Sequence, residues 1–198
     1  GAGRQRKAIR RLEHAVDLAL KARNPLPAAL ATVNIGYCRL DLGDAGAAES
    51  AARAALEQAE GLALRPGALV SLRVQLARAL RARGKTEEAV QLLREAQVAA
   101  VSSWAFPRRQ ALAHFAGCRL ELGETDEALR VAHEAMAQPA QDVRSRIVAL
   151  RVLGSCLAAA GDRPAARFAV RQATALSGAT EMSGELSASQ KALSALPS

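Results

Sequence analysis

The stretch Gly84-Lys85-Thr86 is the part of this 198-residue sequence whose residue types and spacing come closest to a known chemical motif. It matches the end of the phosphate-binding loop G-x-x-x-x-G-K-[ST], in which backbone N–H groups and the lysine hold nucleotide phosphates. Two observations argue against a nucleotide site. Ala79 stands where the loop requires its first glycine, and residues 72–80 (LRVQLARAL) have helical apolar spacing where a β-strand should precede the loop.

A third observation explains the stretch, because related stretches occur four times. Their central glycines are Gly43, Gly84, Gly123 and Gly161, which are 41, 39 and 38 residues apart. Glycine or alanine stands seven residues before each of them, at Gly36, Ala77, Ala116 and Gly154. Alanine stands five residues after each, at Ala48, Ala89, Ala128 and Ala166, and twelve after each, at Ala55, Ala96, Ala135 and Ala173. A fixed period of this length predicts stacked helical repeats.

Each glycine lies between two runs with helical apolar periodicity, which predicts a turn between two helices. A glycine just past a helix end supplies the left-handed conformation that closes the helix. Oxygen-bearing side chains follow closely and are expected to cap the next helix, at Asp44, Thr86, Thr125 and Asp162. The unit is therefore an antiparallel helix hairpin whose small residues let the two backbones approach closely. On this interpretation Lys85 is a turn residue that can be replaced at little cost.

The sequence resembles the tetratricopeptide repeat family in its small residue, turn glycine and paired alanines, repeated four times. The period of about 40 residues is longer than that family's usual one. It is similar to the helical-repeat sensor regions of bacterial transcription regulators and signalling ATPases, and to repeats attached to bacterial protease-like domains. The resemblance implies an all-α, right-handed superhelical α-solenoid. It also implies a cytoplasmic protein–protein interaction or peptide-binding module in a larger bacterial regulatory protein, active in transcription regulation or signal transduction.

We expect one solenoid over residues 1–198. Residues 4–23 are expected to form the second helix of a truncated repeat, because Ala8 and Ala15 follow Gly3 at the spacing of the other units. A cloning remnant at the first residues is the other explanation of that match. The expected repeats cover 26–61, 66–101, 104–138 and 141–177, and 181–196 is expected to be a capping or truncated helix. Trp104 is expected to pack against a neighbouring hairpin, with a partner contact as the alternative.

We find no pattern typical of an enzyme, a cofactor or a metal site. The three cysteines, Cys38, Cys118 and Cys156, all stand five residues before a turn glycine, which predicts free thiols packed in the core of a reduced, cytoplasmic protein. The three histidines lie on different predicted helices without an H-E-x-x-H motif. No run of 18 uncharged apolar residues occurs, so no membrane span is expected.

The net charge of +8 is concentrated near the start of the chain, at Arg4, Arg6, Lys7, Arg10 and Arg11. This basic patch could hold a phosphate-rich partner or an acidic protein surface. It could also be a solvated outer face that needs no partner. No aromatic residues are interleaved for stacking on bases, so we expect at most weak, non-specific binding of nucleic acid that falls steeply with salt.

Functional residues of such a solenoid are expected on its concave face, opposite the buried positions of each first helix. The predicted groove residues are Val33, Tyr37, Leu40, Val74, Arg78, Arg81, Gln110, Leu120, Arg151 and Ser155. Arginines beside an apolar wall suit a peptide or helix with apolar anchors and a carboxylate. The alternatives are a groove lined only by solvent and a structural spacer or self-association surface.

Overall fold

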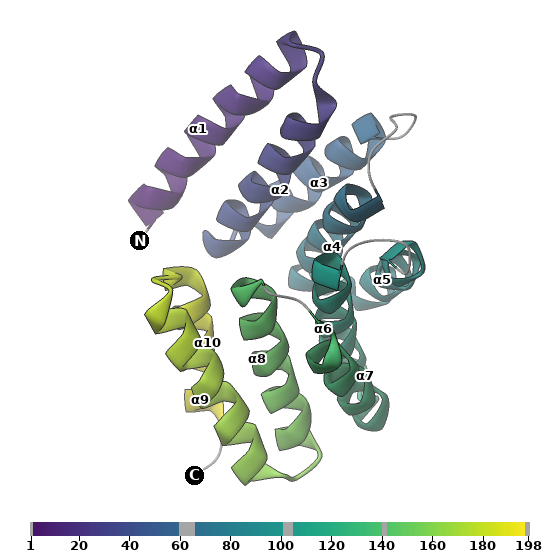
Figure 1. Cartoon of the computed structure of the whole chain (residues 1–198), viewed down its shortest axis with the longest axis vertical. Helices are drawn as coiled ribbons and strands as arrows, with labels where there is room; N and C mark the ends of the chain where they lie inside the picture. Colours follow the sequence, from purple (N-terminus) through teal and green to yellow (C-terminus); the bar gives the residue numbers. More distant parts are fainter. Residues whose placement is uncertain (1, 60–65, 101–104, 140–141, 197–198) are drawn as a thin grey trace. The chain divides into compact units, whose positions relative to one another are not determined.

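A computed structural model of the chain describes residues 2–59, 66–100, 105–139 and 142–196 (Figure 1). These ranges contain ten α-helices and no strand. The contacts divide the chain into two compact units, Gly1–Ser103 (unit 1) and Trp104–Ser198 (unit 2). The boundary falls between the second and third expected repeats. Trp104 lies outside the described residues, so its expected packing stays a prediction.

Unit 1 contains five helices in its described part: α1 (Ala2–Lys21), α2 (Pro25–Asp41), α3 (Ala45–Ala59), α4 (Pro66–Ala82) and α5 (Thr86–Ala100). Helices α2 and α3 form one hairpin, α4 and α5 form the next, and α1 packs on α2. The first helices of the two hairpins also pack on one another, since α2 contacts α4. This lateral contact brings together the residues of the candidate site.

The described part of unit 2 also contains five helices: α6 (Ala105–Glu121), α7 (Thr125–Ala137), α8 (Val143–Ala159), α9 (Arg163–Ala179) and α10 (Ser183–Ala195). Two hairpins, α6–α7 and α8–α9, again pack through their first helices, and α10 contacts both α8 and α9. The prediction of all-α helix hairpins is therefore confirmed in both units, and each expected repeat range contains one pair of helices. The right-handed superhelix stays a prediction.

The four turn glycines have the predicted left-handed backbone, with φ of 79° at Gly43, 76° at Gly84, 80° at Gly123 and 90° at Gly161. In the second turn the N–H of Lys85 donates to the carbonyl of Leu80 at 3.0 Å, so the Gly84-Lys85-Thr86 stretch closes a helix. Asp44 and Asp162 cap the following helices, because each accepts a backbone N–H at 3.1 Å. The cap expected at Thr125 is wrong. That residue lies inside α7, and the capping position is held by Glu124 without a side-chain bond.

The small residues of the repeat lie where the two helices of each hairpin meet. All eight alanines that follow the turn glycines are buried, with exposed fractions of 4% or less. A Cβ atom on Gly154 would collide with Val170 and would lie 3.0 Å from the backbone oxygen of Ala166. The short side chains therefore set the distance between the helices.

The cysteines are free thiols, with Cys118 and Cys156 buried and Cys38 half-buried. No helix in the described ranges has the length and apolar character that crossing a membrane requires. In those ranges, no group of three His, Cys, Asp or Glu side chains is placed to hold a metal ion.

Candidate functional site

The candidate site of unit 1 is built where α2 and α4 approach each other at Gly36. A Cβ atom on Gly36 would lie 2.5 Å from Nε2 of Gln75, so only glycine lets this amide come so close to α2. Gln75 is 1% exposed, and its Nε2 has no hydrogen-bond partner among the described residues. The contact that the repeat pattern predicts for packing thus receives a polar side chain.

The other end of the Gln75 amide holds Arg78, one turn further along α4. Nη1 of Arg78 donates to Oε1 of Gln75 at 3.0 Å. The guanidinium carbon of Arg78 also lies 4.1 Å from the centroid of the Tyr37 ring on α2, at cation–π distance. We call Tyr37, Gln75 and Arg78 the Tyr37 cluster. Two of these three residues, Tyr37 and Arg78, are predicted groove residues, and the structure brings them together.

The charge of Arg78 is not neutralised within the described part of the chain. Arg78 is half-buried and makes no ion pair with any described residue. Its planar group is fixed on one side by the Tyr37 ring and at one nitrogen by Gln75. The remaining N–H groups can donate in parallel to a carboxylate, the geometry that guanidinium groups favour. The cluster is thus a pre-oriented cation beside an aromatic surface.

The other groove predictions in unit 1 have mixed outcomes. Val74 is 1% exposed, so its prediction as a groove-lining side chain is wrong. Val33 packs partly against a buried cluster that includes Ala29 and Leu72. Leu40 and Arg81 are half-buried. The physical reason is the lateral contact of α2 with α4, which buries positions that a hairpin considered alone would leave open.

In unit 2, the predicted groove residues are either buried or already paired. Gln110 is 3% exposed, which makes its prediction as a lining residue wrong. Arg151 forms an ion pair with Glu185 of α10 at 2.8 Å, and both side chains are largely buried. Ser155 donates to the backbone oxygen of Arg151 in its own helix at 3.2 Å, and Leu120 is half-buried. A groove that extends over both units stays a prediction.

A buried arginine of unit 2 also has a structural task. Nε of Arg109 donates to the carbonyl of Ala135 at 3.3 Å, and Nη2 donates to the carbonyl of Gln138, at the end of α7. Burial lowers the pKa of Arg109, and the neighbouring charge of Arg146 lowers it further. This side chain therefore satisfies helix-terminal carbonyls.

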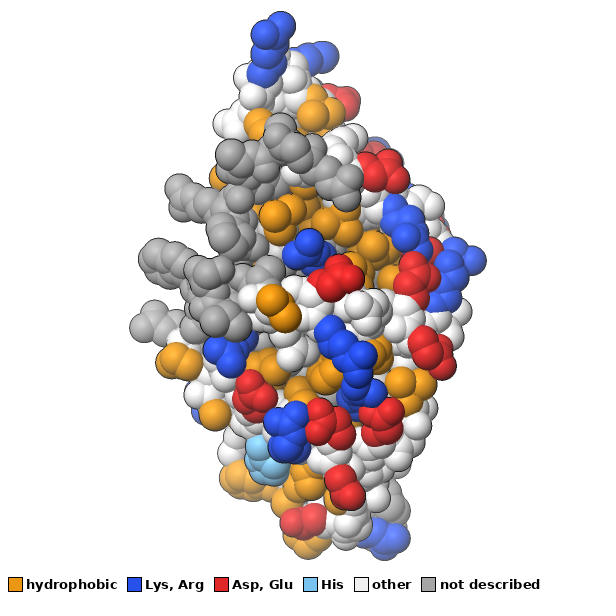
Figure 2. Space-filling model, turned by 90° about the vertical axis from the view of Figure 1, so that its right-hand side faces the viewer, with side chains coloured by type: hydrophobic (Ala, Val, Ile, Leu, Met, Phe, Trp, Pro, Cys, Tyr) orange, Lys and Arg blue, Asp and Glu red, His pale blue; other side chains and the backbone are white. Residues whose placement is uncertain are grey.

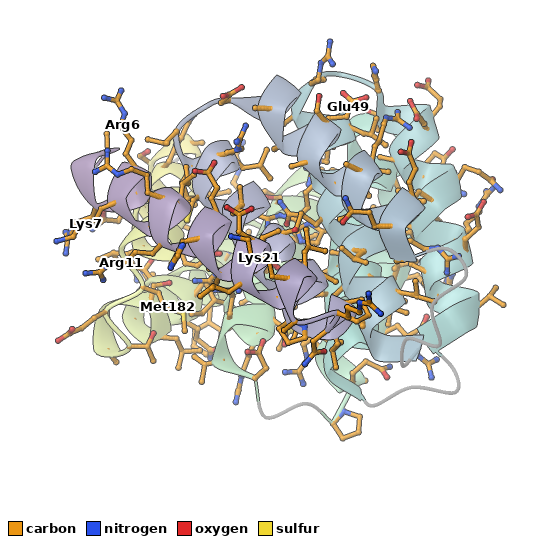
Figure 3. The ribbon with its side chains drawn as sticks, turned by 90° about the horizontal axis from the view of Figure 1, so that it is seen from above. Arg6, Lys7, Arg11, Lys21, Glu49 and Met182 are labelled. Carbon is orange, nitrogen blue, oxygen red and sulfur yellow. The ribbon has the colours of Figure 1, made fainter. Side chains whose placement is uncertain are left out.

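The basic patch lies on α1, where all five predicted side chains lie at the surface: Arg4, Arg6, Lys7, Arg10 and Arg11. None of them forms an ion pair with a residue in the described ranges. The acidic residue Glu13 on the same helix is already paired with Arg39 of α2 at 3.4 Å. Acidic and basic side chains are interleaved on the face shown in Figure 2. Figure 3 shows the labelled Arg6, Lys7 and Arg11 projecting outward from α1.

A buried carboxylate, Glu49 of α3 (labelled in Figure 3), forms a charge cluster that the sequence interpretation missed. Glu49 is 5% exposed and accepts hydrogen bonds from three cations. Nζ of Lys85 lies 2.9 Å from Oε1, Nη1 of Arg83 lies 2.8 Å from Oε2, and Nη2 of Arg53 lies 3.0 Å from Oε1. Lys85 is therefore more than a turn residue, because it links its own turn to α3.

The electrostatics of this cluster favour an ionised Glu49. The hydrogen bond from Lys85 is the main cause that lowers its pKa, and burial opposes this effect. Bonds from Arg53 and Arg83 lower the pKa further, and the result is about 2. Since three cations surround one carboxylate, the cluster is suited to holding helices together and leaves no acid available for catalysis near neutral pH.

Two sequence signals could have pointed to the missed residues. Gln75 is the one polar, uncharged side chain within the apolar-periodic run 72–80. Glu49 directly follows the inward-facing Ala48, at a position where the other repeats have Val90, Leu129 and Arg167. A polar residue within a predicted apolar face is a candidate for a specific interaction.

The comparisons with known proteins identify a fold. No protein-family model matches the sequence, and the search of curated proteins finds no match. Among solved structures, BtubC (BKLC) from P. vanneervenii is similar with a TM-score of 0.64 and 19% identity, over 97% of this chain and 84% of that chain. The TPR-like repeats of a putative kinesin light chain from Podosopora anserina are similar with a TM-score of 0.59 and 20% identity, over 90% and 89%. A variant of the same repeats gives 0.61 and 19%, over 91% and 90%.

At these identities the similarity shows the fold. The chain has a tetratricopeptide-like fold of helical hairpin repeats, as its turn glycines and alanines predict.

Proposed function

We propose that the chain is a non-enzymatic scaffold for protein–protein interaction that binds a peptide segment at the Tyr37 cluster. The observation that carries the proposal is Arg78, whose guanidinium is oriented by Tyr37 and Gln75 and has no acidic partner among the described residues. A carboxylate that reaches Arg78 gains hydrogen bonds to an already oriented charge. Such bonds contribute about 1.5–3 kcal/mol each.

The chemistry of the cluster defines the kind of peptide. An Asp or Glu side chain would bind Arg78, and an apolar side chain next to it would contact the exposed part of the Tyr37 ring. Tyr and Arg side chains are the types most often found to dominate the binding energy of interfaces. The partner is therefore expected to combine acidic and apolar groups.

The setting of this interaction is proposed from the sequence resemblance. The chain would be the sensor or interaction segment of a larger bacterial regulatory protein in the cytoplasm, with a role in transcription regulation or signal transduction. Stacked helical repeats commonly supply such extended binding surfaces. The rival function is a structural spacer or self-association surface, which requires no peptide.

The test is a peptide array of random twelve-residue sequences, followed by titration of the selected peptides. The parent chain should select peptides with an acidic residue beside an apolar one. Arg78→Glu should weaken them at least tenfold, in line with the loss of one charge-assisted bond. Tyr37→Ala should weaken them less, through lost apolar contact.

Arg94→Glu, a charge reversal on exposed α5 of the same unit, is the matched control and should leave affinity unchanged. Circular dichroism should show equal helical content for all four proteins. If the selected peptides bind the Arg78→Glu variant as well as the parent, the Tyr37 cluster is not their site. Sedimentation that reveals a concentration-dependent dimer, without peptide selection, would favour the self-association function instead.

A second candidate function is supported by the basic patch of α1. Its five surface cations lack ion-pair partners among the described residues, so they could attract a polyanion. Binding of a fluorescent DNA duplex should then be weak, independent of sequence and steeply reduced by salt, because the bound counterions are released. Changing Arg6, Lys7 and Arg11 to Gln should abolish it. Binding that survives physiological salt or this triple change would contradict the proposal.

A further inference from the structure

The first hairpin contains a cavity of about 350 Å³ that is separate from the Tyr37 cluster. It lies where the end of α1, the start of α2 and the end of α3 meet, and its walls are apolar, with Leu20, Pro25, Ala28 and Ala55 among the lining residues. The volume is at the lower end of the range of ligand pockets, roughly 300–1,000 Å³. A small ligand would fit it better than a folded partner.

Comparison of the repeats shows why the cavity occurs here. The residues fifteen and fourteen positions before the turn glycine are Ala28 and Ala29 in the first repeat. The same positions hold Leu69 and Val70, Arg108 and Arg109, and Arg146 and Ile147 in the other three. Val70, Arg109 and Ile147 are all buried, so each fills the corresponding space with a larger side chain. Only the first repeat has two alanines there.

The rim of the cavity carries one kind of charge. Arg23 is its charged lining residue, with the polar side chains of Asn24 and Gln58 beside it, and no acidic side chain lines it. The guanidinium of Arg23 makes no ion pair with any residue in the described part of the chain. An apolar space with an unpaired guanidinium at its mouth suits an apolar molecule that ends in a carboxylate.

The backbone of Arg23 adds an independent observation. Arg23 has a φ of 52°, in the left-handed region that the four turns at Gly43, Gly84, Gly123 and Gly161 reserve for glycine. Non-glycine residues held in this region are concentrated at functional sites. Glu181 has a φ of 54° in the turn between α9 and α10, so such a turn accepts either sign of charge. The turn geometry therefore does not explain why residue 23 is basic.

We propose that this cavity binds a small apolar monocarboxylate, with its apolar body between α2 and α3 and its carboxylate on Arg23. This site would make the chain a receptor for a small ligand, which goes beyond the proposed peptide binding and does not depend on it. Ligand binding at this site would fix α1 relative to the first hairpin, since the lining residues come from all three helices.

Isothermal titration calorimetry of the full chain with octanoate, octylammonium and octanol tests the proposal. Octanoate should bind saturably and at least tenfold more tightly than the other two. The double change Ala28→Leu with Ala29→Val, which places the residues of the second repeat in the first, should fill the cavity. It should abolish octanoate binding and keep or raise the melting temperature.

Arg23→Gly should remove the preference for octanoate over octanol without loss of stability, because it also relieves the left-handed backbone. Glu181→Gly is the matched control, since it makes the same backbone change in the other unit and should leave binding intact. Octylammonium binding as tightly as octanoate would overturn the assignment in favour of a cationic ligand. The proposal also fails if no probe binds saturably, or if the filled variant binds octanoate like the parent.

Discussion

Units 1 and 2 are built on the same repeat register but use their arginines differently. In unit 1, Arg78 lies on the Tyr37 ring with no acidic partner among the described residues. In unit 2, Arg151 is paired with Glu185, and Arg109 is buried on the carbonyls at the end of α7. The repeat pattern therefore fixes where the helices lie, whereas single side chains decide whether a cation stabilises the fold or is available to a ligand.

The same contrast exists at the two helix glycines. Gly36 of unit 1 faces the end of the flexible Gln75 side chain, and Gly154 of unit 2 faces the β-branched Val170 and the backbone of α9. One small-residue position can thus support a polar cluster or a plain core. Predictions that compare the two units can test this difference.

The largest effect is expected from Gly154→Ala in unit 2. The new methyl group would meet Val170 and the backbone oxygen of Ala166, neither of which can move without shifting α9. Overpacking of this kind costs about 1–3 kcal/mol, and we expect a loss near the upper end. The free energy of unfolding from urea titration measures it. An unchanged urea midpoint would show that α8 and α9 are less closely packed than described.

Gly36→Ala is the matched change in unit 1, and it should affect binding more than stability. The methyl group would displace the Gln75 amide, which can rotate away, and alanine would contribute about 1 kcal/mol through its higher helix propensity. The net change in unfolding free energy should be below about 1 kcal/mol. Because Gln75 orients Arg78, affinity for acidic peptides should nevertheless fall. Equal losses of stability in the two glycine variants would remove the distinction between the units.

An intermediate effect is expected from Glu49→Gln. The buried carboxylate interacts with three cations from α3 and the α4–α5 turn, so its neutralisation should cost about 2 kcal/mol at pH 7. Glu185→Gln in unit 2 removes a carboxylate with a single cation and should cost less. Urea titrations of both variants at pH 7 provide the comparison. A larger loss for Glu185→Gln would contradict the view that Glu49 holds the more important charge cluster.

The pH dependence of stability distinguishes the Glu49 charge from its shape. Its pKa is lowered from 4.5 to about 2 in the folded chain, so the unfolded state binds more protons between these values. The contribution of Glu49 is therefore complete above pH 4.5 and is lost as the pH falls towards 2. The parent should lose more stability than Glu49→Gln over this window. Parallel pH profiles would show that the carboxylate is not ionised in the folded state as described.

Much of the fold can be predicted because glycine and alanine have strict local requirements. Left-handed backbone at Gly84 and close packing at Ala89 follow from residue type and position alone. The same pattern could not predict that Val74 and Gln110 are buried, because lateral contacts between first helices depend on neighbouring repeats.

The candidate site was harder to predict for the same reason. Tyr37 and Arg78 follow from the register, but Gln75 joins them only through a contact between two hairpins. The link from Lys85 to Glu49 crosses 36 residues, and no periodicity within one repeat contains it. Charge partners that differ from repeat to repeat therefore require the three-dimensional structure.

The smallest expected effects concern the helix caps, where the two units should be alike. Asp44 in unit 1 and Asp162 in unit 2 accept the same backbone hydrogen bond, each at 3.1 Å. Replacement of either by alanine should cost about 1 kcal/mol, and replacement by asparagine should cost almost nothing, because asparagine caps equally well. Thermal and urea unfolding of the four variants measure these changes. Since a cap is a local interaction, the two alanine variants should agree within about 0.5 kcal/mol even though the glycine and glutamate variants differ between the units. A large difference between Asp44→Ala and Asp162→Ala would mean that the contrast between the units extends to their backbone turns and does not arise from single side chains alone.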